Sequence, residues 1–180
     1  GSVVQFETAA IDDVAAVTAT AHRHGALVVW DCSHAAGAIP LHLDDWEVDL
    51  AVGCTYKYLH GGPGSPAFTY LAHRHVDLRQ PIQGWFGQQD QFAMGPAYSP
   101  VPGVAGWQAG TPSIVALTVA AAGIDVVAEA GIEAVRAKSL SLGHVMLTSF
   151  EELVSGLARL RDAVAAGDHL RLPEEPGRVT

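Results

Sequence analysis

The sequence predicts an α/β domain, with a mostly parallel sheet and flanking helices, that leads into a long helical segment. Residues 10–24 place apolar side chains at helical spacing, and the apolar run 27–31 follows at once. A helix that feeds a continuously apolar strand is the unit of a buried parallel sheet. Two further strand-like runs cover residues 48–54 and 66–71, and helical patterns fill most of residues 111–160.

Local signals support the first helix. Asp12 and Asp13 suit its first turn, where a carboxylate faces the positive end of the helix dipole, and Gly25 suits its end. The run before it, residues 1–6, is strand-like.

Turn and breaker signals divide the rest of the chain. Residues 61–65, Gly-Gly-Pro-Gly-Ser, predict a turn before the third strand. Residues 80–110 have no clear period, and so long an irregular stretch indicates function or an interface. Thr111, Pro112 and Ser113 are expected to open the next helix, with Pro112 in its first turn. Helical patterns then cover residues 116–129 and 132–160.

Composition narrows the class of protein. The 180 residues are 49% hydrophobic and 16% charged, which is typical of a globular domain with a core. A net charge of -9 argues against nucleic acid or an anionic membrane as partner. We find no signal peptide and no apolar stretch of membrane-spanning length, so a cytoplasmic protein is expected. The chain ends indicate an internal portion of a longer chain.

Asp31 and Lys57 carry the candidate chemistry, because each stands at the end of an apolar strand. Ligands of open α/β sheets bind at the carboxyl ends of the strands, and a charge there is costly unless it is paired or used. Lys57 can form a Schiff base with an aldehyde, and Asp31 can hold a protonated ring nitrogen, as pyridoxal 5'-phosphate (PLP) chemistry requires. The spacing alone equally allows Asp31 to cap a loop and Lys57 to reach solvent.

Three separated motifs carry a family resemblance. They are Asp31-Cys32-Ser33-His34, the run Tyr56-Lys57-Tyr58-Leu59-His60-Gly61-Gly62-Pro63-Gly64, and Gly84-Trp85-Phe86-Gly87 followed by Gln91-Phe92-Ala93-Met94 and Gly110-Thr111-Pro112. In this order they resemble the class V, fold-type-I PLP enzymes over roughly residues 12–160. The motif around Lys57 is similar to that of kynureninase in particular.

The resemblance implies roles around the cofactor. Lys57 would hold PLP as a Schiff base and later move the Cα proton of the substrate. Asp31 would pair with the pyridinium nitrogen, and His34 would lie against the cofactor near its phenolate side. Tyr56 would bind the phosphate and serve as a candidate proton donor. The alternatives without a role at the cofactor are a loop histidine for His34 and a core or interface aromatic for Tyr56.

The resemblance also implies a homodimer. Trp85 and Thr111 would reach the phosphate of the neighbouring subunit's cofactor, and Phe86 would line the substrate pocket. The alternatives are a core or interface aromatic for Trp85 and a helix cap for Thr111.

The implied activity is PLP-dependent hydrolysis of L-kynurenine, or of 3-hydroxykynurenine, to anthranilate or 3-hydroxyanthranilate and L-alanine in tryptophan catabolism. Residues 1–135 would be part of the PLP-binding large domain, and residues 136–180 a helix linking it to a small C-terminal domain. This piece alone is expected to be inactive. One departure concerns Gln88, because the family motif usually has His after Gly-Trp-x-Gly, so the substrate could be a relative of kynurenine.

Other functions remain open at this point. A cysteine desulfurase needs a reactive cysteine on an exposed loop, whereas Cys32 and Cys54 lie at strand ends. A non-catalytic α/β domain that binds a nucleotide or a partner is the second alternative, although no Gly-x-Gly-x-x-Gly turn follows a strand. The histidine pairs in residues 22–24 and 73–75 lack the cysteines or carboxylates of a zinc set, so no metal is predicted.

Overall fold

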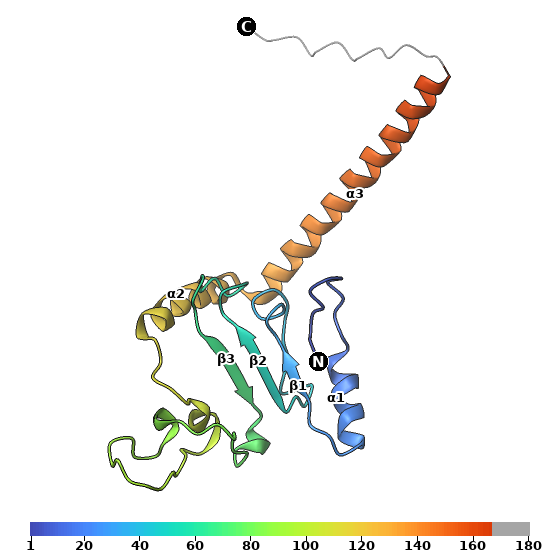
Figure 1. Cartoon of the computed structure of the whole chain (residues 1–180). Coiled ribbons are helices and arrows are strands. Elements are labelled where there is room, and N and C mark those ends of the chain that lie inside the picture. The colour runs from blue at the N-terminus through green and yellow to red at the C-terminus, as the bar shows by residue number, and fades with distance from the viewer. Residues whose placement is uncertain (167–180) are drawn as a thin grey trace. The chain divides into compact units, whose positions relative to one another are not determined.

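The computed structural model describes residues 1–166 of the chain (Figure 1). Its helices are α1 (Val14–Arg23), α2 (Ile114–Ala130) and α3 (Ile132–Ala165), its strands are β1 (Val29–Asp31), β2 (Leu50–Cys54) and β3 (Ala67–Leu71), and its short 3-10 helices are η1 (His73–His75), η2 (Trp85–Gly87) and η3 (Gly103–Trp107). The chain divides into two compact units, Gly1–Arg136 and Ala137–Thr180.

The three strands form one sheet in the order β1-β2-β3. β1 and β2 are parallel, with Asp31 opposite Val52, whereas β2 and β3 are antiparallel. The α/β class is therefore confirmed, with a mixed sheet among the described strands. β3 runs antiparallel because residues 55–66 form turns without a helix, and a parallel return needs a longer crossover.

The first six residues extend the sheet beyond β1 through isolated bridges rather than a full strand. The Val3 N–H donates to the carbonyl of Asp31 at 3.0 Å, and the Asp31 N–H donates to the carbonyl of Gly1 at 2.8 Å. The backbone of Asp31 is thereby held from both sides, since its next neighbour, Cys32, donates its N–H to Val52 of β2 at 2.7 Å.

α1 begins at Val14, four residues later than the periodicity predicts. Asp13 is its N-cap, and the side chain accepts a hydrogen bond from the Ala16 N–H at 3.0 Å, so this carboxylate ends the preceding loop instead of entering the helix. At the other end Gly25 has a φ of 70°, a left-handed conformation that favours glycine, as predicted for the stop.

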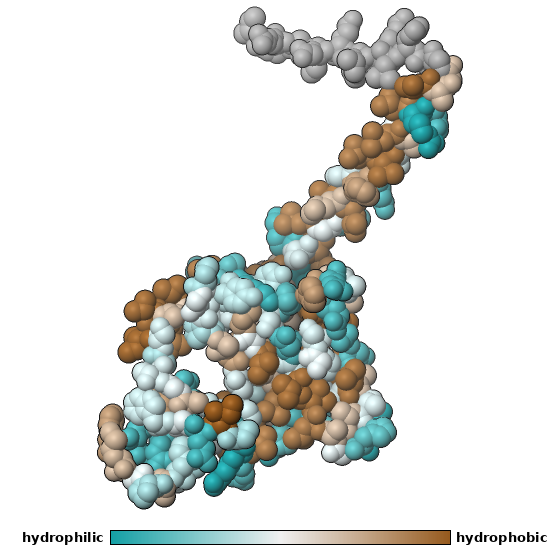
Figure 2. Space-filling view, in the orientation of Figure 1, coloured by the Kyte–Doolittle hydropathy of each residue, from teal (hydrophilic) through white to brown (hydrophobic). Residues whose placement is uncertain are grey.

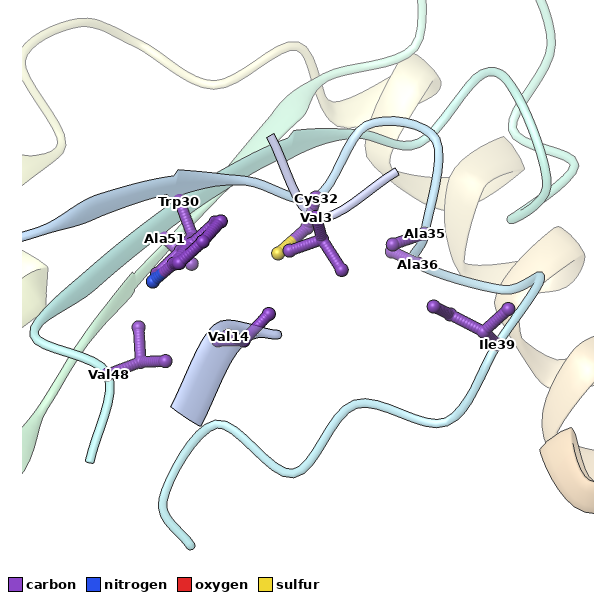
Figure 3. Close-up of a cluster of buried hydrophobic side chains, with 9 residues drawn as sticks. All are labelled: Val3, Val14, Trp30, Cys32, Ala35, Ala36, Ile39, Val48 and Ala51. Atoms are coloured by element: carbon purple, nitrogen blue, oxygen red, sulfur yellow. The ribbon is translucent and has the colours of Figure 1, made fainter. Parts of the chain in front are cut away.

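The core lies between α1 and one face of the sheet (Figure 3). Trp30 of β1 is 1% exposed, and its indole N–H donates to the Thr18 hydroxyl of α1 at 2.9 Å. Burial of such a side chain is worth about 1.5–3 kcal/mol. The opposite face of the same strands is open, because Val29 is 50% exposed and Val52 is 39% exposed. The core is formed by Val3, Val14, Trp30, Cys32, Ala35, Ala36, Ile39, Val48 and Ala51.

The start of α2 differs from the prediction, whereas α3 begins at Ile132 as predicted. α2 begins at Ile114 with Ser113 as N-cap, so Pro112 precedes the cap rather than occupying the first turn, and Thr111 does not cap the helix. Gly131, with a φ of 77°, ends α2. Figure 2 shows apolar side chains along α3, where Leu147 and Phe150 are among those exposed.

Within residues 1–166, no single helix has both the length and the apolar character needed to cross a membrane. α2 and α3 meet that test only when they are taken together across the bend between them.

Candidate functional site

Asp31 and Lys57 follow neighbouring parallel strands. Asp31 is the last residue of β1, and Lys57 comes shortly after Cys54, the last residue of β2. Since β1 and β2 are parallel, their carboxyl ends meet at one edge of the sheet. The two side chains are close enough for the charge of Lys57 to act on the Asp31 carboxylate.

The Asp31 carboxylate is held in its ionised form. Burial by itself raises the pKa of the carboxyl, but the hydrogen bonds from Ser33 and the charges of Lys57 and His34 together outweigh this effect. The Ser33 N–H donates to Oδ1 of Asp31 at 2.7 Å. The net result is a pKa of Asp31 below its ordinary value, so the group is negative at neutral pH.

Lys57 projects from a loop that is closed on itself. The Gly61 N–H donates to the carbonyl of Thr55 at 2.8 Å, and the His60 N–H donates to the carbonyl of Lys57 at 3.3 Å. The buried Thr55 hydroxyl donates to the carbonyl of Pro66 at 2.6 Å. These contacts fix the backbone on both sides of the half-buried Lys57.

Two glycines bring neighbouring segments against this loop. Gly37, at a φ of 84°, lies so close to Tyr58 that a Cβ there would stand 2.4 Å from the Tyr58 carbonyl oxygen. Gly123 of α2 is equally close to the loop, since its Cβ would lie 2.5 Å from the carbonyl oxygen of Leu59. The segment after Asp31 and the middle of α2 therefore both pack on the Lys57 loop.

Tyr56 and His34 border the pair. The Lys57 ammonium lies 5.3 Å from the centroid of the Tyr56 ring, a cation–π distance, and Tyr56 is 50% exposed. The half-buried His34 ring stacks on Phe6 with centroids 6.3 Å apart. Four of the predicted site residues thus gather at one edge of the sheet: Asp31, His34, Tyr56 and Lys57.

The other three predicted site residues lie elsewhere in this chain. Trp85 is 48% exposed in η2 and meets Phe86 and Phe92 edge-on, at centroid distances of 5.4 and 6.3 Å. Thr111 is exposed in the segment before α2. Among residues 1–166, no hydrogen bond, ion pair or ring contact joins these residues to Asp31 or Lys57.

A cavity of about 210 Å³ lies between residues 76–83 and residues 98–107. Its lining includes Arg79, Tyr98 and Trp107 but none of the predicted site residues.

The residues at the sheet edge fit PLP by the chemistry of their groups. A carboxylate that stays ionised suits a protonated ring nitrogen, and a primary amine within its field suits an aldehyde. Ser33, which stabilises the charge of Asp31, was not predicted from the sequence. The Asp-x-Ser pattern could have indicated it, because Asp side chains commonly accept a bond from the N–H two residues on.

Comparisons with known proteins agree with this site. The family model described as aminotransferase class-V matches residues 3–163. The chain is 44% identical over 154 residues to a protein named kynureninase from Burkholderia mallei (strain SAVP1), a match that covers 85% of this chain and 37% of that protein. It is 39% identical over 179 residues to a kynureninase from Pseudomonas fluorescens, covering 97% of this chain and 43% of that protein.

The chain thus spans less than half the length of these curated relatives. Among solved structures, a cysteine desulfurase from Thermococcus onnurineus NA1 superposes with a TM-score of 0.69 at 22% identity, over 84% of this chain and 38% of that one. A likeness at this identity shows the shared fold alone. Because the family model matches nearly the whole described chain, the protein belongs to the aminotransferase class-V family.

Proposed function

We propose that the protein containing this chain uses PLP to hydrolyse L-kynurenine, or 3-hydroxykynurenine, to anthranilate or 3-hydroxyanthranilate and L-alanine. The observation that carries the proposal is the 39–44% identity to proteins named kynureninase. The meeting of Asp31 and Lys57 at one sheet edge supports it, since this is the pair that PLP chemistry needs.

Four residues of this chain would hold the cofactor. Lys57 would bind its aldehyde, Asp31 its ring nitrogen and Tyr56 its phosphate, with His34 against it. When bound, PLP supplies an electron sink for the negative charge that develops on the substrate. The ionised state of Asp31 supports its part, because a carboxylate favours the protonated form of a neighbouring ring nitrogen.

Lys57 and Tyr56 would move the protons. The Lys57 amine would take the proton from the substrate Cα and give a proton back to Cα when alanine forms. Water would add to the γ-carbonyl carbon, and the Cβ–Cγ bond would break with its electron pair left on Cβ. The Tyr56 hydroxyl would donate a proton to Cβ and regain one from the hydrated γ-carbon as that carbon becomes the carboxyl group of anthranilate. The closeness of the two side chains supports these roles in proton transfer, since the Lys57 ammonium lies 5.3 Å from the Tyr56 ring centroid.

Trp85, Thr111 and Phe86 belong to the proposal through a homodimer in the cytoplasm. Trp85 and Thr111 would contact the phosphate of the neighbouring subunit's cofactor, and Phe86 would line the substrate pocket. Trp85 and Thr111 are exposed, and no contact joins them to Lys57 within residues 1–166, which is what a cross-subunit role requires.

The test uses the protein expressed from its complete gene, called here the full-length protein. It is purified with PLP, and anthranilate release from kynurenine is followed beside the visible absorption of the bound cofactor. Lys57→Ala is expected to lose both. The matched control is Lys138→Ala, because Lys138 is the second lysine of the chain and is exposed on α3. Anthranilate release by Lys57→Ala at the rate of the unchanged protein would refute the proposal.

The same assay separates the alternative activities. A cysteine desulfurase would release alanine from cysteine, and a non-catalytic binding domain would show no cofactor absorption. Cys32 is a poor nucleophile for the first, because it is fully buried and burial, together with the charge of Asp31, raises the pKa of its thiol to about 11.

A further inference from the structure

Gln88 closes a loop with its side chain. Its Oε1 accepts a hydrogen bond from the backbone N–H of Ser99 at 2.7 Å, and its Nε2 donates to the carbonyl of Ala97 at 3.4 Å. A side-chain amide has one acceptor oxygen and one donor nitrogen, and here both face the backbone of the returning segment. The amide therefore has a structural role, whereas the sequence related Gln88 only to the choice of substrate.

The contact stands in a short antiparallel ladder. Gln88 and Pro100 form an isolated bridge, the Gln89 N–H donates to the carbonyl of Ser99 at 2.8 Å, and the Val101 N–H donates to the carbonyl of Gly87 at 2.9 Å. In a bridge of this kind the backbone bonds join the neighbours of the two paired residues, so the ladder needs no N–H from Pro100. The Gln88 amide adds to the ladder by accepting the N–H of Ser99, the residue before Pro100.

This ladder is continuous with η2, which carries Trp85 and Phe86. The Gln88 N–H donates to the carbonyl of Trp85 at 3.3 Å, and the Gln91 side chain donates to the carbonyl of Phe86 at 2.8 Å. On its other side η2 is packed tightly, because a Cβ on the buried Gly87 would lie 2.5 Å from the carbonyl oxygen of Gly106. The turn that presents the two aromatic rings is thus held from both sides.

We infer that Gln88 is a positioning residue, whose amide ties residues 88–99 into a closed loop and so sets where Trp85 and Phe86 stand. The inference rests on the proposed function, in which Phe86 lines the substrate pocket. Gln88 acts through the backbone of η2 and its neighbours rather than by touching the substrate. The closed loop also carries Phe92, whose ring meets Trp85 edge-on.

Two variants of the full-length protein test the hydrogen bonds. Gln88→Leu removes both, and the KM for kynurenine is expected to rise about tenfold, the effect of about 1.4 kcal/mol, with a smaller change in kcat. Gln88→Glu keeps the acceptor for the Ser99 N–H but sets a carboxylate oxygen against the carbonyl oxygen of Ala97, so its KM is expected to rise less than that of Gln88→Leu. Gln83→Leu is the control, since Gln83 is exposed and takes no part in the ladder.

A double-mutant cycle asks whether the effect passes through the aromatic turn. If Gln88 acts by placing Phe86, adding Gln88→Leu to Phe86→Leu raises the KM less than it does in the unchanged protein. A fully additive effect, or an unchanged KM in Gln88→Leu, overturns the inference.

A measurement that does not depend on activity separates the positioning role of Gln88 from the proposed hydrolysis of kynurenine. Hydrogen exchange of peptides from residues 84–101 is expected to quicken in Gln88→Leu, with the rest of the chain unchanged and Gln83→Leu unaffected. If the unchanged protein does not hydrolyse kynurenine, the proposed function fails, and this exchange still decides whether the amide closes the loop. Exchange equal to that of the unchanged protein overturns the inference whatever the activity.

Discussion

His75 and Asp49 meet across 26 residues of sequence, with Nε2 of His75 2.8 Å from Oδ1 of Asp49. Asp49 is 1% exposed, and both oxygens of its carboxylate make hydrogen bonds. Oδ1 also accepts from Arg74 at 2.7 Å, while Oδ2 accepts from the Val28 N–H and lies 2.9 Å from Nε2 of His22. One buried charge, placed directly before β2, thereby joins α1, η1 and the residue before β1.

Replacing Asp49 is expected to destabilise the protein strongly. Asp49→Asn leaves Arg74 and both histidines facing a neutral amide, and breaking a buried pair typically costs about 3–5 kcal/mol. Because Arg74 is 43% exposed, the lower end is expected. The free energy of unfolding in urea measures it. Asp45→Asn is the control, since the Asp45 side chain is 85% exposed and should change stability by less than about 0.5 kcal/mol.

The same network predicts a pH dependence. Burial alone raises the pKa of Asp49, but the hydrogen bonds from Val28, His22, His75 and Arg74 outweigh it and hold the pKa far below its ordinary value. A depressed pKa in the folded state gives stability that is present above about pH 4, the unfolded value, and is lost as the pH falls further. The stability gap between the unchanged protein and Asp49→Asn should narrow below pH 4. A gap that is constant from pH 6 to pH 3 would contradict this origin.

Asp31→Asn tests the electrostatic role of the carboxylate. The amide can still accept the Ser33 N–H bond but carries no charge, so the cofactor is expected to bind while kcat falls at least about tenfold, or about 1.4 kcal/mol of transition-state stabilisation. Steady-state kinetics with kynurenine and the cofactor spectrum measure the two effects. Asp125→Asn, at an exposed position of α2, should match the unchanged protein. Equal kcat in Asp31→Asn would remove Asp31 from its proposed role.

Two helix glycines are expected to respond with opposite signs. Gly123→Ala places a Cβ 2.5 Å from the Leu59 carbonyl oxygen, so overpacking of about 1–3 kcal/mol should exceed the gain in helix propensity. Gly143→Ala in α3 meets nothing within 4 Å and should stabilise by up to about 1 kcal/mol. Thermal unfolding of both variants decides. A higher Tm for Gly123→Ala would mean that α2 does not pack on the Lys57 loop as described.

Cys32 is expected to resist alkylation in the folded protein. It is 0% exposed, and the raised pKa of its thiol, about 11, leaves almost no thiolate at pH 8. Peptide mapping after iodoacetamide treatment should find Cys32 unmodified until denaturant is added. Cys54, which is partly exposed, serves as the internal comparison. Rapid modification of native Cys32 would show that the core beside β1 opens.

Local patterns were enough to place the strands and the two charged residues at their ends. The apolar runs 27–31 and 48–54 are short, as buried strands are, and turn residues follow them. Asp31 ends the first run, and Lys57 comes shortly after the second. The motifs around them also carried the family, which the family model confirms. Such features depend on neighbours in sequence, so the sequence by itself determined them.

The tertiary structure decided which distant residues meet. Nothing in the pattern of Val48-Asp49-Leu50 pairs Asp49 with His22 and His75, because periodicity reports which side chains are buried and not what faces them. Periodicity also does not report three other features: the antiparallel direction of β3, the hydrogen bond from the Ser99 N–H to the Gln88 amide, and the packing of Gly123 against Leu59. Each rests on a hydrogen bond or a close packing contact between segments that only folding brings together.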